Sequence, residues 1–507
     1  MQNSPSLKWN ASANFVGLAY TTVIGTVVLP LYLKHLGAEA FGLIGFFLVL
    51  QAWMQLFDLG MSPVLSRQTA QFRGENAGYL ELLKLVRSLE IIVSGIALVV
   101  FLGMSAASAW VASNWLKVGL LSPEKVSNCV VLMGLIIGLR FLATLYRSGI
   151  QGTEKQVALN IANIVFVTLR FVGALFLLKY ITQDIGDFFV YQLCVGLLEL
   201  AALAAMFYRF FPVTEKVGIA ISWRALGPLL PFAGGMAYTT ALWVVVTQLD
   251  KLILSNILPL SEYGFFSLVA VVSAGIIQIG APISQAILPR MTYFLAKGEE
   301  GQMLLLYRQS TQLMAAIMLP LTGIIAVFSA ELLFAWTGNA EAANWAGPVL
   351  FWFALGNGIL AISAFQFYLQ FAHGKLRLHV IYISVAAAIQ IPVIVYVAYE
   401  YGVFGVALAW FILRMISFFA WTPIVHRKFA RGIHWSWLVG DIGPSFAVTT
   451  TLLLLVTSFN LPFGELSRTS TLVALIGIGI VVLTCNILVS RAPRNLLFST
   501  IRSFRND

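Results

Sequence analysis

The sequence predicts an all-α protein that crosses a membrane about fourteen times. Of its 507 residues, 59% are hydrophobic and only 10% are charged. Its mean hydropathy is +0.88. Apolar runs long enough to span the hydrocarbon layer, about 20 residues each, recur along the whole chain. A soluble chain carries about 25% charged residues, so this composition excludes the soluble class.

Charges, glycines, prolines and polar clusters separate the expected spans. The expected limits are 10–34, 38–66, 88–110, 127–147, 157–179, 187–209, 227–255, 262–288, 309–331, 346–372, 380–399, 404–426, 437–458 and 469–490. We expect a six-helix lobe over residues 1–217 and a second over 218–432. Residues 433–507 would add two further helices and a tail. An even number of spans places both termini on the same side.

The basic residues indicate which side that is. If the N-terminus is cytoplasmic, 22 of the 31 lysines and arginines fall on the cytoplasmic side, 5 on the opposite side and 4 inside spans. Cytoplasmic loops collect basic residues because translocating them is unfavourable. Both termini are therefore predicted to be cytoplasmic. The net charge of +10 follows from the same bias and does not indicate a nucleic-acid partner.

The two predicted lobes show weak internal similarity. Phe41-Gly42 matches Tyr263-Gly264 at a shift of 222 residues, and Arg67 matches Arg290 at a shift of 223. Both arginines follow an even-numbered span, so the repeat would be parallel. The alternative is that aromatic-glycine pairs and helix-end arginines recur by chance. Similar registers over more than 40 residues favour duplication.

Ionisable residues inside the expected spans are the strongest functional signal. Each costs at least about 2.5–3.5 kcal/mol at a helix centre, so it usually faces a partner or a hydrated cavity. Arg170, Glu199 and Arg414 lie near span centres. Arg140 is placed where its side chain can also reach towards the cytoplasmic end. Lys251 lies near the outer end of the seventh span, and Asp58 near the cytoplasmic end of the second.

Polar residues at helical spacing extend these positions into stripes. We predict a hydrated cavity between the two halves, with an excess of cationic groups that suits an anionic ligand. The predicted substrate-contacting residues are Asn14, Gln51, Gln55, Arg140, Arg170, Thr247, Lys251, Gln278 and Arg414. The alternative is that such polar groups only join neighbouring helices, for about 0.6 kcal/mol each. Arg170 and Glu199 would then form a structural pair.

Motifs for other chemistry are absent from the sequence. The five histidines lack the spacing of metal ligands. There is no phosphate-binding loop of the Walker type. We therefore predict a transporter with no catalytic residue, no metal and no cofactor. This chain alone would not drive transport with ATP.

Several short motifs stand out along the chain. They are Asn14 and Pro30 in the first span, LGAEAFG at Leu36–Gly42, FDLGM at Phe57–Met61, Arg67 with Ala70, QLDKLILS at Gln248–Ser255 and EYGFFS at Glu262–Ser267. Together they resemble the bacterial polysaccharide flippases, the Wzx-type branch of the superfamily that also contains MATE exporters and lipid II flippases.

The resemblance implies two lobes around a central cationic cavity. It implies transfer of undecaprenyl-diphosphate-linked oligosaccharides to the periplasmic leaflet of the inner membrane by ion-coupled alternating access. Arg170, Lys251 and Arg414 would meet the diphosphate or acidic sugars. The ion-coupling candidates are Asp58, Glu199 and Asp250. A polysaccharide polymerase and glycosyltransferases would be partners.

Two other functions remain open at this stage. An exporter of small organic cations on the same fold would need a cavity dominated by carboxylates, whereas the deepest residues include Arg170 and Arg414. A membrane-embedded polysaccharide transferase or polymerase usually needs acidic or histidine clusters in sizeable loops, and the expected outer loops are short.

Overall fold

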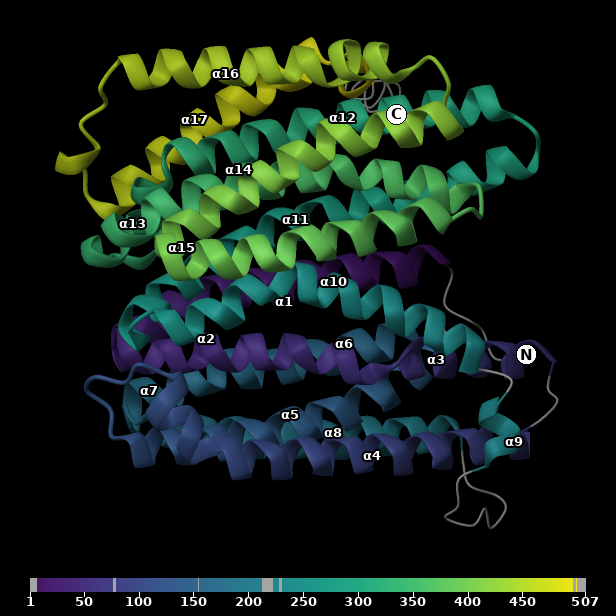
Figure 1. Cartoon of the computed structure of the whole chain (residues 1–507), viewed down its shortest axis with the longest axis vertical. Coiled ribbons are helices and arrows are strands. Elements are labelled where there is room, and N and C mark those ends of the chain that lie inside the picture. The colour runs from purple at the N-terminus through teal and green to yellow at the C-terminus, as the bar shows by residue number, and fades with distance from the viewer. Residues whose placement is uncertain are drawn as a thin grey trace. The chain divides into compact units, whose positions relative to one another are not determined.

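The computed structural model describes residues 7–75, 79–153, 155–211, 222–227, 230–495 and 498. Within these ranges the chain is helical, and its extended pairing is limited to one bridge between Lys117 and Pro259. The α-helices (Figure 1) are α1 (Leu7–Leu36), α2 (Ala38–Trp53), α3 (Met61–Glu75), α4 (Tyr79–Trp110), α5 (Pro123–Gly152), α6 (Gln156–Thr168), α7 (Ala174–Tyr180), α8 (Ile185–Phe210), α9 (Trp223–Leu226), α10 (Leu230–Ile257), α11 (Leu260–Ala296), α12 (Glu300–Val327), α13 (Ser329–Thr337), α14 (Ala340–Ala372), α15 (Arg377–Phe429), α16 (Gly443–Ser458) and α17 (Arg468–Val489).

In the part of the chain that the structure describes, five short segments of different helical pitch join or interrupt these helices. η1 (Met54–Asp58) and η6 (Phe463–Glu465) are 3₁₀ helices. The π-helical segments are η2 (Val111–Trp115), η3 (Leu169–Gly173) and η5 (Ser436–Ile442).

The prediction of an all-α membrane protein is confirmed. Twelve helical segments in the described residues are long and apolar enough to cross a membrane. One of them is the 53-residue α15, whose backbone leaves the helical conformation at Gly402, between the eleventh and twelfth expected spans. The seventh expected span corresponds to α10, which is not among the twelve.

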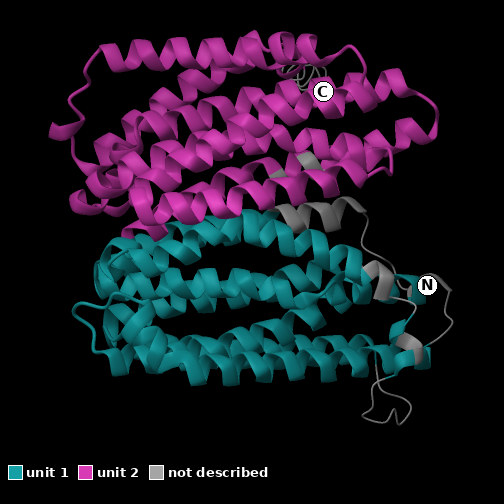
Figure 2. Ribbon diagram, in the orientation of Figure 1, with its two compact units in different colours: residues 1–264 teal, residues 265–507 magenta. Residues whose placement is uncertain are grey.

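The chain forms two compact units, residues 1–264 and 265–507 (Figure 2). This division lies beyond the expected lobe boundary at residue 217, because α10 packs against α2 and η1 of unit 1. In unit 1, α5 packs against both α4 and α8. In unit 2, α14 packs against α12 and α15.

The two C-terminal helices belong to unit 2. α16 and α17 pack against each other and against α12. Their contact is an apolar cluster in which Phe328, Leu453, Leu475 and Val482 are buried. The expected extra pair of helices therefore has a specific packing partner in the described part of the chain.

The repeat found in the sequence has a structural counterpart within unit 1. A Cβ atom on Gly42 would lie 2.1 Å from the Leu260 carbonyl oxygen, and one on Gly264 would lie 2.3 Å from the Ala38 carbonyl oxygen. A shift of 222 residues converts one contact into the other. The segments Ala38–Gly42 and Leu260–Gly264 therefore cross as a two-fold symmetric pair, with each glycine admitting the backbone of its repeat partner.

The connection between η2 and α5 is fixed beside this crossing. Glu39, only 7% exposed, accepts hydrogen bonds from the backbone N–H groups of Gly119 at 2.6 Å and Leu120 at 2.7 Å. The Lys117 carbonyl accepts one from the Leu260 N–H at 3.0 Å. A buried carboxylate thus ties this connection to the start of α2.

Candidate functional site

Three arginines meet inside unit 1. Arg140 and Arg147 lie seven residues apart on α5, so they share one face of that helix, two turns apart. Arg170 lies in η3, a π-helical turn between α6 and α7. Single π-helical turns are common at functional sites because the inserted residue changes the direction of its neighbours. All three side chains are at least partly buried.

Glu199 of α8 is the acidic partner of two of these arginines. Its Oε1 accepts a hydrogen bond from Nη2 of Arg147 at 2.8 Å, and its Oε2 is ion-paired with Nη2 of Arg170. Glu199 is 1% exposed, whereas 34% of the Arg147 side chain and 18% of the Arg170 side chain are exposed. The carboxylate is therefore held from both sides by arginines that reach the surface.

Arg140 is held by neutral amides. Its Nη1 donates to Oε1 of Gln51 at 2.6 Å, and its Nη2 donates to Oε1 of Gln192 at 3.0 Å. Its guanidinium carbon also lies 5.1 Å from the ring centre of Phe47. Gln192 in turn donates to the carbonyl oxygen of Arg170 at 2.8 Å.

We name these six residues the arginine cluster: Gln51, Arg140, Arg147, Gln192, Arg170 and Glu199. It contains three cations and one carboxylate, which pairs with two of them, so its formal charge is +2. Among the described residues, Glu199 is the one acid that contacts these arginines. Nε of Arg140 and Nε of Arg170 are buried without a hydrogen-bond acceptor. Like charges this close repel strongly at low dielectric, so the cluster favours an additional anion.

The arginine cluster contains four of the twelve predicted site residues. Arg140, Arg170 and Gln51 come together with Glu199, which was predicted as an ion-coupling residue. Gln192 was not among the predicted site residues. Arg147 was not a predicted site residue, because the expected span ended there and the residue was assigned to the cytoplasmic loop. Helix α5 continues to Gly152, which places Arg147 within it.

The remaining predicted residues of unit 1 lie elsewhere. Gln55 is exposed on η1. Asp58 accepts hydrogen bonds from the N–H of Ser62 at 3.2 Å and from its hydroxyl at 2.5 Å, so it binds the first turn of α3. Asn14 lies on α1, but its side chain is outside the described part of the structure.

The predicted residues of α10 contact one another. Lys251 Nζ lies 3.3 Å from Oδ1 of Asp250 and donates to the carbonyl oxygen of Thr247 at 2.6 Å. Asp250 is 1% exposed. The Thr247 hydroxyl donates to the carbonyl oxygen of Trp243 in its own helix. The lysine side chain thus bends back along its helix to reach the neighbouring carboxylate.

Arg414 and Gln278 belong to unit 2. Arg414 is 4% exposed, and its guanidinium carbon lies 4.1 Å from the ring centre of Trp410. Its Nη2 donates to Oε1 of Gln390 at 3.1 Å. Arg414 is therefore held by an aromatic ring and an amide of the same long helix. Gln278 is exposed on α11.

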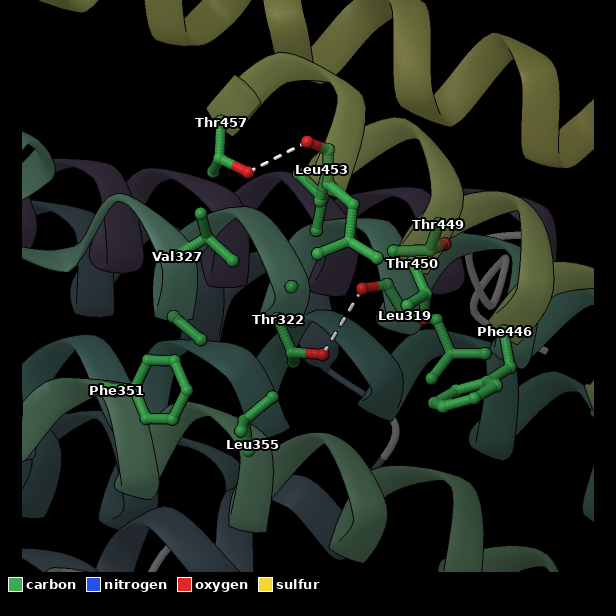
Figure 3. A pocket seen from close by; sticks show the side chains of 13 residues that line it. Leu319, Thr322, Val327, Phe351, Leu355, Phe446, Thr449, Thr450, Leu453 and Thr457 are labelled. Carbon is green, nitrogen blue, oxygen red and sulfur yellow. Dashed lines mark hydrogen bonds between the residues drawn. The ribbon is translucent and has the colours of Figure 1, made fainter. Parts of the chain in front are cut away.

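Unit 2 also contains an apolar pocket of about 210 Å³ between α12, α14 and α16 (Figure 3). Two threonine hydroxyls beside it donate to carbonyl oxygens of their own helices, Thr322 to Met318 and Thr457 to Leu454. The Thr449 hydroxyl donates to Oδ1 of Asn486 on α17. Their polarity is thereby satisfied locally. The pocket is lined by Leu319, Thr322, Gly323, Ala326, Val327, Phe351, Leu355, Phe446, Thr449, Thr450, Leu453, Leu454 and Thr457.

The described residues contain no cluster of three or more histidine, cysteine or acidic side chains placed to hold a metal ion. The chemistry available at the arginine cluster is therefore charge recognition by guanidinium groups and hydrogen bonding by amides.

Comparison with known proteins gives a consistent result. The model of a family described as polysaccharide biosynthesis protein matches residues 7–295, which is more than half of the chain. A putative O-antigen transporter of Shigella flexneri is 22% identical over 404 residues, covering 79% of this chain and 93% of that protein.

Solved structures share the fold at low sequence identity. A structure of the lipid II flippase MurJ in an inward closed conformation has a TM-score of 0.67 and 14% identity, covering 96% of this chain and 99% of that one. An inward-facing multidrug resistance MATE transporter of the MOP superfamily has a TM-score of 0.58 and 12% identity, covering 81% and 96%. The chain therefore belongs to the polysaccharide biosynthesis protein family and has the fold of the MOP superfamily.

Proposed function

We propose that this protein is a flippase for lipid-linked oligosaccharides. It would move undecaprenyl-diphosphate-linked repeat units from the cytoplasmic to the periplasmic leaflet of the bacterial inner membrane, for surface polysaccharide export. Family membership and the similarity to a putative O-antigen transporter support this proposal. The observation that carries it is the arginine cluster, which places a net charge of +2 inside a membrane-embedded helical unit.

A diphosphate group matches the chemistry of this cluster. Guanidinium groups bind phosphoryl oxygens through two parallel hydrogen bonds, and they are more weakly hydrated than ammonium groups. A diphosphate that links a lipid to a sugar carries two negative charges, which equals the excess of the cluster. The amides of Gln51 and Gln192 would hold Arg140 ready for such a ligand.

Transport would proceed by alternating access coupled to an ion gradient, with no enzymatic step. Glu199, Asp58 and Asp250 remain the candidate coupling carboxylates. Asp250 and Glu199 are each 1% exposed. A change in the charge of either carboxylate would therefore change the electrostatic energy of its surroundings more than the same change at Asp58. Both termini would be cytoplasmic, and glycosyltransferases and a polymerase would act before and after this step.

An export function for small organic cations is the main competitor, since MATE transporters share the fold. The charge of the arginine cluster opposes it, because three guanidinium groups repel a cation and one carboxylate does not compensate them.

The test replaces Arg140, Arg147 and Arg170 singly by glutamine in a strain whose surface polymer depends on this chain. Arg209→Gln is the matched control, because Arg209 is exposed on the same helix as Glu199. We expect the three variants to lose most surface polymer at wild-type protein levels, while the control retains it. Normal polymer combined with lost resistance to cationic drugs would support the competing function instead.

A further inference from the structure

Glu199 is held differently from an ordinary buried carboxylate. Among the described residues, its partners are Arg147 and Arg170, one at each carboxylate oxygen. No backbone N–H or hydroxyl group in the described part of unit 1 donates to it. Both partners are long, rotatable side chains that are partly exposed. Among the described residues, this carboxylate is therefore held by guanidinium groups alone.

The arrangement has the form of an occupied anion site. Proteins bind phosphoryl groups in the same way, with guanidinium groups that contact different oxygens of one anion. We propose that Glu199 is a built-in substitute for the diphosphate of the substrate, which displaces it from Arg147 and Arg170 on binding. This inference rests on the proposed function. It implies that Glu199 itself occupies the anion site of the arginine cluster when no ligand is bound.

The charges determine which ligands can displace Glu199. The carboxylate carries one negative charge and leaves Arg140 without an acidic partner in the described residues. A ligand with one negative charge would only exchange one anion for another. A ligand with two negative charges gains the additional attraction of the uncompensated cation. Glu199 would therefore make the site selective for diphosphates over singly charged phosphate diesters.

Displacement is physically reasonable because the arginines do not depend on Glu199 alone. Nη1 of Arg147 also donates to Oδ1 of Asn163 at 2.9 Å. The Arg170 backbone is fixed by hydrogen bonds from Gln192 at 2.8 Å and Tyr32 at 3.2 Å to its carbonyl oxygen. The cationic groups therefore remain positioned for a ligand when the carboxylate moves away.

The experiment measures ligand binding to the full chain in nanodiscs of zwitterionic phosphatidylcholine. The probes are inorganic pyrophosphate and dimethyl phosphate, which carries one negative charge. The variants are Glu199→Gln, Glu199→Asp, Arg140→Gln and the control Arg209→Gln. We expect Glu199→Gln to bind pyrophosphate at least about tenfold more tightly than the wild type, because the internal competitor is removed. We expect the same variant to gain affinity for dimethyl phosphate and Glu199→Asp to remain close to the wild type.

Stability provides a second measurement if Glu199→Gln weakens the fold. The variant leaves the guanidinium groups of Arg147 and Arg170 without their carboxylate, so its Tm should fall. Pyrophosphate should then raise the Tm of Glu199→Gln more than that of the wild type. An equal or smaller rise in the variant would contradict the inference.

The outcomes separate this inference from the proposed function. If the wild type binds pyrophosphate and Arg140→Gln weakens binding, the cluster is an anion site. Equal affinities of Glu199→Gln and the wild type would then overturn only the role of Glu199. If neither Glu199→Gln nor the wild type binds pyrophosphate, the arginine cluster is not a diphosphate site and Glu199 is not a substitute for a diphosphate.

Discussion

Two buried glutamates of unit 1, Glu39 and Glu199, satisfy their carboxylates in opposite ways. Glu39 accepts hydrogen bonds from consecutive backbone N–H groups, at 2.6 Å from Gly119 and 2.7 Å from Leu120. Glu199 contacts two arginine side chains. The first carboxylate is bound to the chain itself, whereas the second is bound to groups that rotate and attract other anions.

The difference separates a structural role from a replaceable one. Backbone donors cannot leave Glu39 unless the connection between η2 and α5 moves, and they carry no net charge that a ligand would seek. Arginine side chains can change partners without moving any helix. A buried carboxylate held by backbone amides is therefore expected to govern stability, and one held by arginines is expected to govern ligand binding.

The largest expected effect is that of Glu39→Ala. The substitution leaves up to three backbone N–H groups without their acceptor, including that of Leu121 at 3.4 Å. A hydrogen bond to a charged group contributes about 1.5–3 kcal/mol, so losing the two short ones should cost on the order of 3 kcal/mol. Thermal unfolding of the purified protein measures it, with Glu124→Ala, an exposed acid in the first turn of α5, as control. Restoration of Tm by pyrophosphate would contradict the structural role.

Asp441 of unit 2 is held by an arginine and a side-chain amide, and it should give the next effect. It is 2% exposed and accepts from Arg308 at 2.7 and 3.0 Å and from Gln312 at 2.7 Å. Arg308→Gln leaves this carboxylate with one neutral partner, at a cost of about 2 kcal/mol after allowance for the partial exposure of Arg308. The Tm should fall, and pyrophosphate binding should be unchanged. Reduced pyrophosphate affinity would show that this carboxylate also takes part in ligand binding.

Asp58 gives a smaller expected effect that also tests its candidate coupling role. Its hydrogen bonds to Ser62 resemble those of a helix cap, so Asp58→Ala should cost about 1 kcal/mol and Asp58→Asn less. Thermal unfolding measures both, and a polymer assay in cells measures function. If Asp58→Asn keeps its stability but abolishes polymer export, Asp58 acts in coupling and its role is not merely structural.

Hydropathy was sufficient to predict the fold because the bilayer demands long apolar helices whatever their packing. The contact between Arg170 and Glu199 was accessible as an alternative, because both residues lie near the centres of consecutive spans. Glu39 was not predicted as a notable residue, because an acidic residue at the end of a span does not carry the insertion cost that marks one at a span centre. Its partners are backbone groups, which the sequence does not distinguish.

The polar stripes were less reliable than the charges. The stripe through Gln51 and Gln55 assumed continuous α-helical spacing, but α2 changes to the 3₁₀ segment η1 at Met54. A 3₁₀ turn has 3.0 residues, not 3.6, so residues four apart no longer share a face. Gln51 consequently contacts Arg140, while Gln55 is exposed.

The smallest expected effect concerns Asp184, an acid outside the membrane spans. Burial raises the pKa of Asp184, but hydrogen bonds from Lys125 and from the N–H of Gly186 lower it more, so the net pKa lies below its ordinary value of 3.8. A depressed folded-state pKa means that the stabilisation is present above pH 3.8 and is lost as pH falls through the lower folded-state pKa. Because Asp184 is partly exposed, the contribution should be below about 1 kcal/mol. Asp184→Asn should therefore flatten the acid side of the curve of Tm against pH and leave pyrophosphate binding unchanged, since its partners include a backbone N–H group and lie outside the arginine cluster. An unchanged acid limb would mean that the ion pair with Lys125 contributes nothing to stability, and backbone capping by Asp184 would then account for its role.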